Sequence, residues 1–258
     1  MALPTVAEVR AKGQPPGLLD RNSGEHWAGR LYIRRVSPAV TRLLLATPAT
    51  PNFVTWLMIL CGVLAGAALS VPELWGAIAA VVLIQLQILF DCSDGELARW
   101  KGISSATGVY LDRLGHFITG AALPIGLGVR ADGGWDSLGG YTSLGLLVAL
   151  LVVLLWSQGA LVHVARADAG LDAVEDRADV AAPRASGLAR LRRAIGLLPF
   201  YRAFVAMETT LLALAAAIFD SLDGSLDGTR FLVVLMVPLA AITFSGRLAA
   251  ILLSSRLR

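Results

Sequence analysis

The chain has 258 residues, of which 56% are hydrophobic and 16% are charged, and its mean hydropathy is +0.68. These values exclude an ordinary soluble domain, and the length indicates one membrane domain rather than several. The formal net charge is +3, but no basic recognition element or stacking motif accompanies it, so nucleic acid is not an expected partner. Only two cysteines occur, Cys61 and Cys92, and no disulfide framework is expected.

The beginning of the chain divides into two parts. Residues 1–25 contain no apolar core of the length that a secretory signal needs, and we expect them to form an N-terminal tail. Residues 26–47 combine Trp27, Leu31 and the leucine run 43–45 with four arginines. This mixture predicts an amphipathic helix that lies in the headgroup plane of the membrane before the first span.

Six apolar runs follow, and each is long enough to cross a hydrocarbon core of roughly 30 Å. The runs cover residues 53–71, 74–92, 108–129, 142–164, 201–219 and 231–253. We therefore expect an all-α integral membrane domain of six transmembrane helices over residues 48–258. A longer loop from about residue 166 to residue 199 separates the fourth run from the fifth.

Positive charge is distributed unevenly among the connections between these runs. The connections after the first, third and fifth runs carry only Arg130 and Arg230 of the 22 lysines and arginines. Cytoplasmic segments of membrane proteins carry the excess of Lys and Arg, so both termini are expected on the cytoplasmic side of the cytoplasmic membrane. Anionic membrane lipid is the expected partner of this charge.

The segment DCSDGELARWKGISSATGVYLDRLGH, residues 91–116, places ionisable side chains in an otherwise apolar chain. Asp91 and Asp94 are three residues apart and share one helix face, while Asp112 and His116, four apart, share another. Ionisable groups at membrane depth are costly and usually serve ions, protons or substrates. Carboxylate oxygens suit hard cations such as Mg²⁺, Mn²⁺ or Ca²⁺, which attract phosphate oxygens. The segment therefore predicts a metal site that takes a diphosphate.

The spacing of this segment resembles the signature of the CDP-alcohol phosphotransferases, also called CDP-alcohol phosphatidyltransferases: Asp-x2-Asp-Gly-x2-Ala-Arg-x8-Gly-x3-Asp-x3-Asp. The fixed positions that fit are Asp91, Asp94, Gly95, Ala98, Arg99, Gly108 and Asp112. The stretch TPNFVT, residues 50–55, is similar to the Pro-Asn-x-x-Thr stretch that opens the first membrane helix of that family. The resemblance covers roughly residues 26–253 and implies six spans after an amphipathic helix.

The resemblance implies a metal-dependent enzyme of phospholipid synthesis whose site faces the cytoplasm. Two divalent ions, Mg²⁺ or Mn²⁺, would hold the diphosphate of a CDP-linked donor, with CDP-diacylglycerol as the leading donor. The hydroxyl of an acceptor, a polar alcohol or its phosphate, would attack phosphorus, and CMP would leave. The resemblance also implies a homodimer.

The resemblance further implies roles for individual residues. Asp91, Asp94 and Asp112 would ligate metal, and small residues of the motif would leave room for the cytidine. Arg99 would contact a phosphate or stabilise the end of its helix. The implied nucleotide-binding set comprises Asn52, Thr55, Asp94, Gly95, Ala98, Arg99 and Gly108.

His116 departs from the family pattern, which has an aspartate at this position that ligates the second metal and serves as the proposed base. Histidine accepts a proton readily near neutral pH, so His116 and Asp112 are the candidate catalytic residues. As a metal ligand, neutral imidazole favours manganese, zinc or iron over magnesium and removes one negative charge from the cluster. Three interpretations stay open: a working base, a metal ligand without that role, or a chain that binds donor without turnover.

The later helices contain candidates for acceptor recognition. Arg166, Arg202 and Arg247 lie at or within predicted spans, where they either bind an anionic headgroup or extend to lipid phosphates. Gln87, one turn before Asp91, either supports that carboxylate or makes a simple interhelical hydrogen bond.

Two other functions are compatible with the same acidic segment. The first function is the same transfer reaction with a soluble CDP-polar alcohol as the donor. The second is a different class, a non-catalytic homologue or a protein that binds or transports divalent cations.

Overall fold

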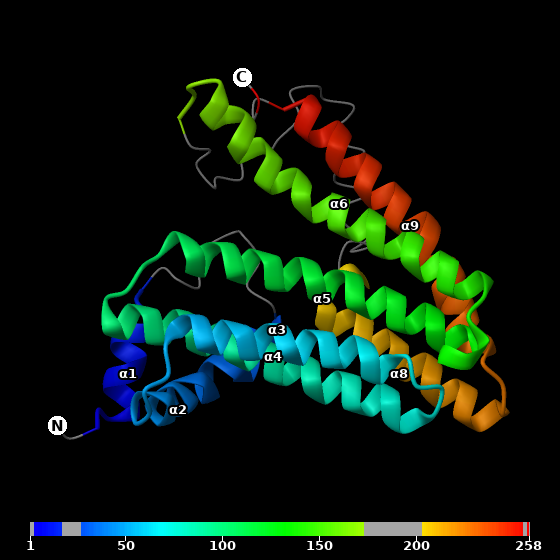
Figure 1. Cartoon of the computed structure of the whole chain (residues 1–258), viewed down its shortest axis with the longest axis horizontal. Helices are drawn as coiled ribbons and strands as arrows, with labels where there is room; N and C mark the ends of the chain where they lie inside the picture. The colour runs from blue at the N-terminus through cyan, green and yellow to red at the C-terminus, as the bar shows by residue number, and fades with distance from the viewer. Residues whose placement is uncertain (1–2, 17–26, 173–202, 255–256, 258) are drawn as a thin grey trace.

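The computed structural model describes residues 3–16, 27–172, 203–254 and 257, and the regular elements within these ranges are all helical (Figure 1). The N-terminal elements are α1 (Val6–Gly13), a π-helical turn (Gly29–Ile33) and α2 (Arg34–Leu45). The long helices are α3 (Pro51–Leu69), α4 (Leu74–Lys101), α5 (Ala106–Asp132), α6 (Gly140–Asp168), α8 (Ala206–Asp223) and α9 (Asp227–Leu252). A short 3-10 turn (Trp135–Ser137) lies between α5 and α6.

Four of these helices, α3, α4, α6 and α9, are long and apolar enough to cross a membrane. Among the described helices, α5 and α8 are long enough but are too polar to count as membrane spans by the same measure. Helix α5 is rich in glycine and polar residues, and α8 carries three carboxylates within 18 residues. Each long helix coincides with one of the predicted apolar runs. The all-helical prediction is therefore confirmed and four spans are supported, while the other two spans stay predictions.

The helix α4 extends beyond the apolar run that ends at residue 92. Good helix formers follow that run, and the helix continues until Gly102, whose φ of 66° stops it in the left-handed region. The next helix, α5, begins at once, because the Ser105 hydroxyl accepts a hydrogen bond from Gly108 N at 3.0 Å. Both halves of the acidic segment consequently lie on helices that meet at this connection.

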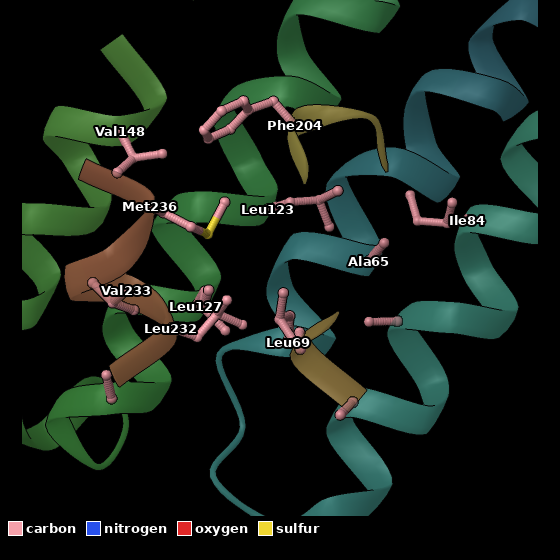
Figure 2. Close-up of a cluster of buried hydrophobic side chains, with 14 of the residues drawn as sticks. Ala65, Leu69, Ile84, Leu123, Leu127, Val148, Phe204, Leu232, Val233 and Met236 are labelled. Carbon is pink, nitrogen blue, oxygen red and sulfur yellow. The ribbon is translucent and has the colours of Figure 1, made fainter. Parts of the chain in front are cut away.

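The core is built around α3, which packs against both α4 and α5. Leu69 of α3, Ile84 of α4 and Leu127 of α5 belong to one buried apolar cluster, which Val148 of α6 and Met236 of α9 complete (Figure 2). The last helices, α6 and α9, pack on each other and on α5, and α8 packs along α4. In Figure 1, α6 and α9 diverge from the group formed by α3, α4 and α5.

Glycines bring the backbones of α3 and α5 close together. A Cβ atom added at Gly126 of α5 would lie 2.1 Å from the carbonyl oxygen of Gly66 of α3. A Cβ atom at Gly62 would lie 1.9 Å from the hydroxyl of Thr119. Small residues allow this approach, as in the small-xxx-small interfaces of membrane helices.

A buried arginine, Arg130, joins several helices at the end of the bundle far from the acidic segment. The Arg130 side chain is only 1% exposed and donates hydrogen bonds to the carbonyl oxygens of Val71 and Glu73, and to the Thr229 hydroxyl at 3.3 Å. The Asp220 carboxylate in turn accepts a hydrogen bond from the Thr229 hydroxyl at 2.5 Å. These contacts join the α3–α4 connection, α5, α8 and α9.

The N-terminal helices α1 and α2 pack against α4. Ser37, Pro38 and Thr41 form the buried side of α2, whereas Val36 and Leu43 are exposed. A polar buried side and an apolar exposed side are the reverse of the pattern in soluble proteins, and suit a helix against a membrane surface. The interfacial position predicted for residues 26–47 stays a prediction.

We predict that Gly126→Ala lowers the stability of the protein by about 1 to 3 kcal/mol, because the added methyl group would meet a backbone carbonyl that has no room to move. Thermal unfolding in detergent measures the change. Gly246→Ala in α9 is the matched control, since no described atom lies within 4 Å of its Cβ position. An unchanged midpoint in Gly126→Ala would contradict the close approach of α3 and α5.

Candidate functional site

Three side chains from α4 and α5 meet where the two helices face each other. His116 Nε2 lies 3.6 Å from Asp91 Oδ1 and 3.7 Å from Asp112 Oδ1. Each of the three residues offers one ligand atom, and these atoms lie within 4.8 Å of one another. The side chains are 32% to 45% exposed, so the group is open to small molecules. The structure thus brings together three of the four predicted metal ligands.

Asp94, the fourth predicted ligand, lies one turn further along α4 and is buried. Its Oδ2 accepts a hydrogen bond from the Thr55 hydroxyl of α3 at 2.7 Å. The same hydroxyl contacts the Pro51 carbonyl oxygen at 3.2 Å, so the threonine is itself oriented by the first turn of α3. Asp94 is outside the group of three but is held in a fixed orientation beside it.

The first turns of α3 and α5 meet next to these carboxylates. A Cβ atom at Gly108 would lie 3.3 Å from Asn52 Oδ1, so glycine allows the asparagine side chain to approach the backbone of α5. The structure therefore places Asn52, Thr55 and Gly108, three members of the predicted nucleotide set, around one end of the site.

Arg99 joins the last turn of α4 to the end of α1. Its Nε donates a hydrogen bond to the Gly13 carbonyl oxygen at 2.5 Å, and its guanidinium atoms lie 3.1 and 3.2 Å from the Cβ position of Gly95. The role predicted for Arg99, a contact with phosphate or support of the helix end, stays a prediction. Ala98, the other small residue of the motif, lies in the last turn of α4, where its carbonyl oxygen accepts a hydrogen bond from Ile103 N at 3.0 Å.

Gln87 makes the simple interhelical contact that was one of its two interpretations. Its Nε2 donates a hydrogen bond to the Thr119 hydroxyl of α5 at 3.2 Å, and both side chains are buried. Gln87 consequently ties α4 to α5 one turn away from Asp91.

The structure describes two of the three predicted acceptor arginines, Arg166 and Arg247. Arg166 donates from Nε to the Asp172 carbonyl oxygen at 2.8 Å, at the end of α6. Arg247 lies against α6, with Nη2 3.1 Å from the Cβ position of Gly159. Arg202, with most of the predicted loop 166–199, lies outside the described residues.

One residue of the acidic segment escaped the sequence prediction. Glu96 occupies a variable position of the signature, yet its side chain is fully buried and receives hydrogen bonds from Gln14, Ser37 and Thr41. The sequence did contain a signal for this residue, because Glu96 is a charged residue in the middle of an otherwise matched motif. Its partners lie 55 to 82 residues earlier in the chain, and no local pattern connects them with Glu96.

Two carboxylates and an imidazole at this spacing are able to do two kinds of chemistry. Oxygen and nitrogen ligands within a few ångströms of one another suit a divalent cation. An imidazole is also suited to accept a proton near neutral pH.

These features define a class: an integral membrane protein of long helices with an acidic, histidine-containing site between two of them. Residues 48–182, more than half of the chain, match the sequence model of the CDP-alcohol phosphatidyltransferase family, and the protein belongs to that family. The resemblance predicted from the motif is confirmed. A search of curated proteins gave no match to the chain. Family membership supports an enzyme with a CDP-alcohol donor and an alcohol acceptor.

We predict that the purified protein binds Mn²⁺ and that Asp112→Asn lowers the affinity at least about tenfold, because one of three clustered ligand groups loses its charge. Electron paramagnetic resonance of free Mn²⁺ measures the binding. Asp136→Asn, in the 3-10 turn between α5 and α6, is the control and should bind like wild type. Equal affinities in Asp112→Asn and wild type would contradict a metal site at this position.

Proposed function

We propose that the protein is a metal-dependent phosphatidyltransferase of phospholipid synthesis. It transfers the phosphatidyl group of CDP-diacylglycerol to the hydroxyl of a polar alcohol or its phosphate, and CMP leaves. The observation that carries the proposal is the convergence of Asp91, Asp112 and His116 within 4.8 Å, in a chain of the CDP-alcohol phosphatidyltransferase family.

The four predicted ligands fit divalent cations by their chemistry. Asp91, Asp94 and Asp112 offer carboxylate oxygens that Mg²⁺ or Mn²⁺ accepts, and His116 offers one basic imidazole nitrogen, either to a metal or, as the alternative, to a proton. Two such ions, when bound, would neutralise the diphosphate and stabilise the departing oxyanion. The Thr55 hydroxyl supports this role because it fixes the Oδ2 atom of Asp94.

His116 is the proposed base. During transfer, the acceptor oxygen forms a bond to the phosphatidyl phosphorus, and the bond from that phosphorus to the bridging oxygen breaks. CMP leaves with the bridging oxygen and its electron pair, while the acceptor proton passes to His116 Nε2. Nε2 lies 3.6 Å from Asp91 Oδ1 and 3.7 Å from Asp112 Oδ1, within the group of side chains where the reaction would take place, and this position supports the role.

The first turns of α3 and α5 are the proposed nucleotide end of the site. Asn52 and Thr55 would order the cytidine portion, and Ala98 and Gly108 would give it room. Gly95 gives room to the Arg99 guanidinium group, whose Nε donates to the Gly13 carbonyl oxygen. Arg99 either contacts a phosphate or supports the end of α4.

The remaining features of the proposal rest on charge and on the family. We place the termini and the site on the cytoplasmic side, where the excess of lysine and arginine predicts them. Arg166, Arg202 and Arg247 are the proposed contacts for an anionic acceptor. A homodimer is the proposed assembly.

We predict that protein supplied with Mn²⁺ or Mg²⁺, CDP-diacylglycerol and a panel of polar alcohols and alcohol phosphates releases CMP. Chromatography of CMP and of the lipid product measures the reaction. Release of CMP only with soluble CDP-polar alcohols would replace the proposed donor. Metal uptake into vesicles without any CMP release would instead favour a transport protein.

We predict that His116→Ala lowers kcat by about 100-fold or more, since removal of a general base typically costs two to four orders of magnitude. Binding of CDP should change little, because the nucleotide contacts lie on α3 and on other residues of α4 and α5. His163→Ala is the matched control: His163 is an exposed histidine of α6 and should be without effect. If His116→Ala turns over at the wild-type rate, His116 is not the general base.

We predict that His116→Asp shifts the preference of the protein from Mn²⁺ toward Mg²⁺. The substitution replaces an imidazole ligand by a carboxylate and adds one negative charge, and hard oxygen ligands favour Mg²⁺. The ratio of Mn²⁺ to Mg²⁺ activation constants, measured for both proteins with the same donor, tests the shift. An unchanged ratio would show that His116 does not ligate metal.

A further inference from the structure

Glu96 is a buried carboxylate that the proposed reaction does not use. Its side chain is 0% exposed, and burial of a charge is costly unless the charge is paired and hydrogen-bonded. Oε1 accepts hydrogen bonds from Ser37 Oγ at 2.5 Å and from Gln14 Nε2 at 2.8 Å. Oε2 accepts one from Thr41 Oγ1 at 2.7 Å, and Arg34 Nη1 lies 3.9 Å from Oε1.

These donors come from two separate parts of the N-terminal region. Gln14 follows directly after α1, whereas Ser37 and Thr41 are four residues apart and lie on one face of α2. Hydrogen bonds to a carboxylate are stronger than neutral ones, so Glu96 joins both helices to α4 through one side chain.

The contact between α1 and α4 leaves no spare room around Glu96. A Cβ atom at Gly13 would lie 3.1 Å from Cγ and 3.2 Å from Cβ of Glu96. One turn of α4 further on, Arg99 Nε donates to the Gly13 carbonyl oxygen at 2.5 Å. Lys12 also lies over the Trp100 ring, 5.0 Å from its centroid. The end of α1 is thus held against successive residues of α4.

Glu96 and the metal-site carboxylates lie on different faces of α4. Each residue advances about 100° around a helix, so Glu96 lies about 200° from Asp94 and about 140° from Asp91. Thr55 holds the face that carries Asp94, and α1 and α2 hold the face that carries Glu96. Consider a side-chain oxygen that lies about 6 Å from the axis of α4. A rotation of the helix by about 20° would displace this oxygen by roughly 2 Å.

We propose that Glu96 is a positioning residue: by joining α1 and α2 to the outer face of α4, it sets the rotation of α4 and hence the places of the Asp91 and Asp94 oxygens opposite Asp112 and His116. The inference rests on the proposed metal-dependent reaction. It assigns a role in catalysis to the N-terminal region.

Glu96→Gln in the full-length protein tests the inference, because the amide keeps the size of the side chain but turns an N–H donor toward the donors of α1 or α2. At a temperature well below unfolding, the Kd for Mn²⁺ should rise about tenfold and kcat at saturating Mn²⁺ should fall about tenfold or more. Glu73→Gln is the matched control: it lies at the other end of α4, is exposed, and has no capping hydrogen bond from its side chain.

A second pair of variants keeps the test independent of the folding of Glu96→Gln. Thr41→Val and Ser37→Ala each remove one donor and leave the carboxylate, and each should raise the Mn²⁺ Kd by a smaller factor. Thr41→Val combined with Glu96→Gln should be no worse than Glu96→Gln alone, since both break the same contact.

The outcomes separate the two proposals. The positioning role would be overturned if the Glu96→Gln variant folds and unfolds at a lower temperature than wild type, yet keeps the wild-type Kd and kcat. A purely structural residue changes stability alone. A wild-type protein that neither binds Mn²⁺ nor releases CMP would overturn the proposed function itself.

Discussion

The separation between α4 and α5 depends on how closely α3 packs against α5. Glycines 62, 66 and 126 allow near-contact of the two backbones, so α3 acts as a thin spacer between the helices that carry the site. A thicker spacer would leave the carboxylates of α4 and the imidazole of α5 too far apart to share a ligand. The three glycines therefore control whether the side chains of α4 and α5 lie close enough to act together.

The site combines exposure with rigid support. Its three clustered side chains are open at their tips, while the buried residues behind them, Thr55, Asp94 and Glu96, are fixed by hydrogen bonds from three other helices. In the proposed reaction, such an arrangement would hold the reactive groups in place before substrate binds and would reduce the reorganisation needed in the transition state. It also explains how four carboxylates are accommodated in one short segment: Asp91 and Asp112 are partly exposed beside His116, and the buried Asp94 and Glu96 accept hydrogen bonds.

Apolar runs and spacing predicted much of this structure. The runs located the long helices, and the three- and four-residue spacings predicted that Asp91 and Asp112 would face a shared site. The extension of α4 beyond residue 92 and the docking of α1 were not predicted, because polar helical turns lack an apolar period. The same limit applies to Glu96 and Arg99: their partners lie on α1 and α2, and contacts between distant segments leave no local pattern.

The buried Arg130 joins helix ends on one side of the bundle. Its hydrogen bonds, with those of Asp220 and Thr229, hold the ends of α5 and α8 and the starts of α4 and α9 together on the side away from the acidic segment. From that end, α6 is a rod of 29 residues, about 43 Å long. A tilt of about 5° at the anchored end would carry its far end through about 4 Å. The contacts at the start of α6, where Asp132 accepts hydrogen bonds from Gly139 N and Thr142 N, therefore have a large effect on the position of its far end.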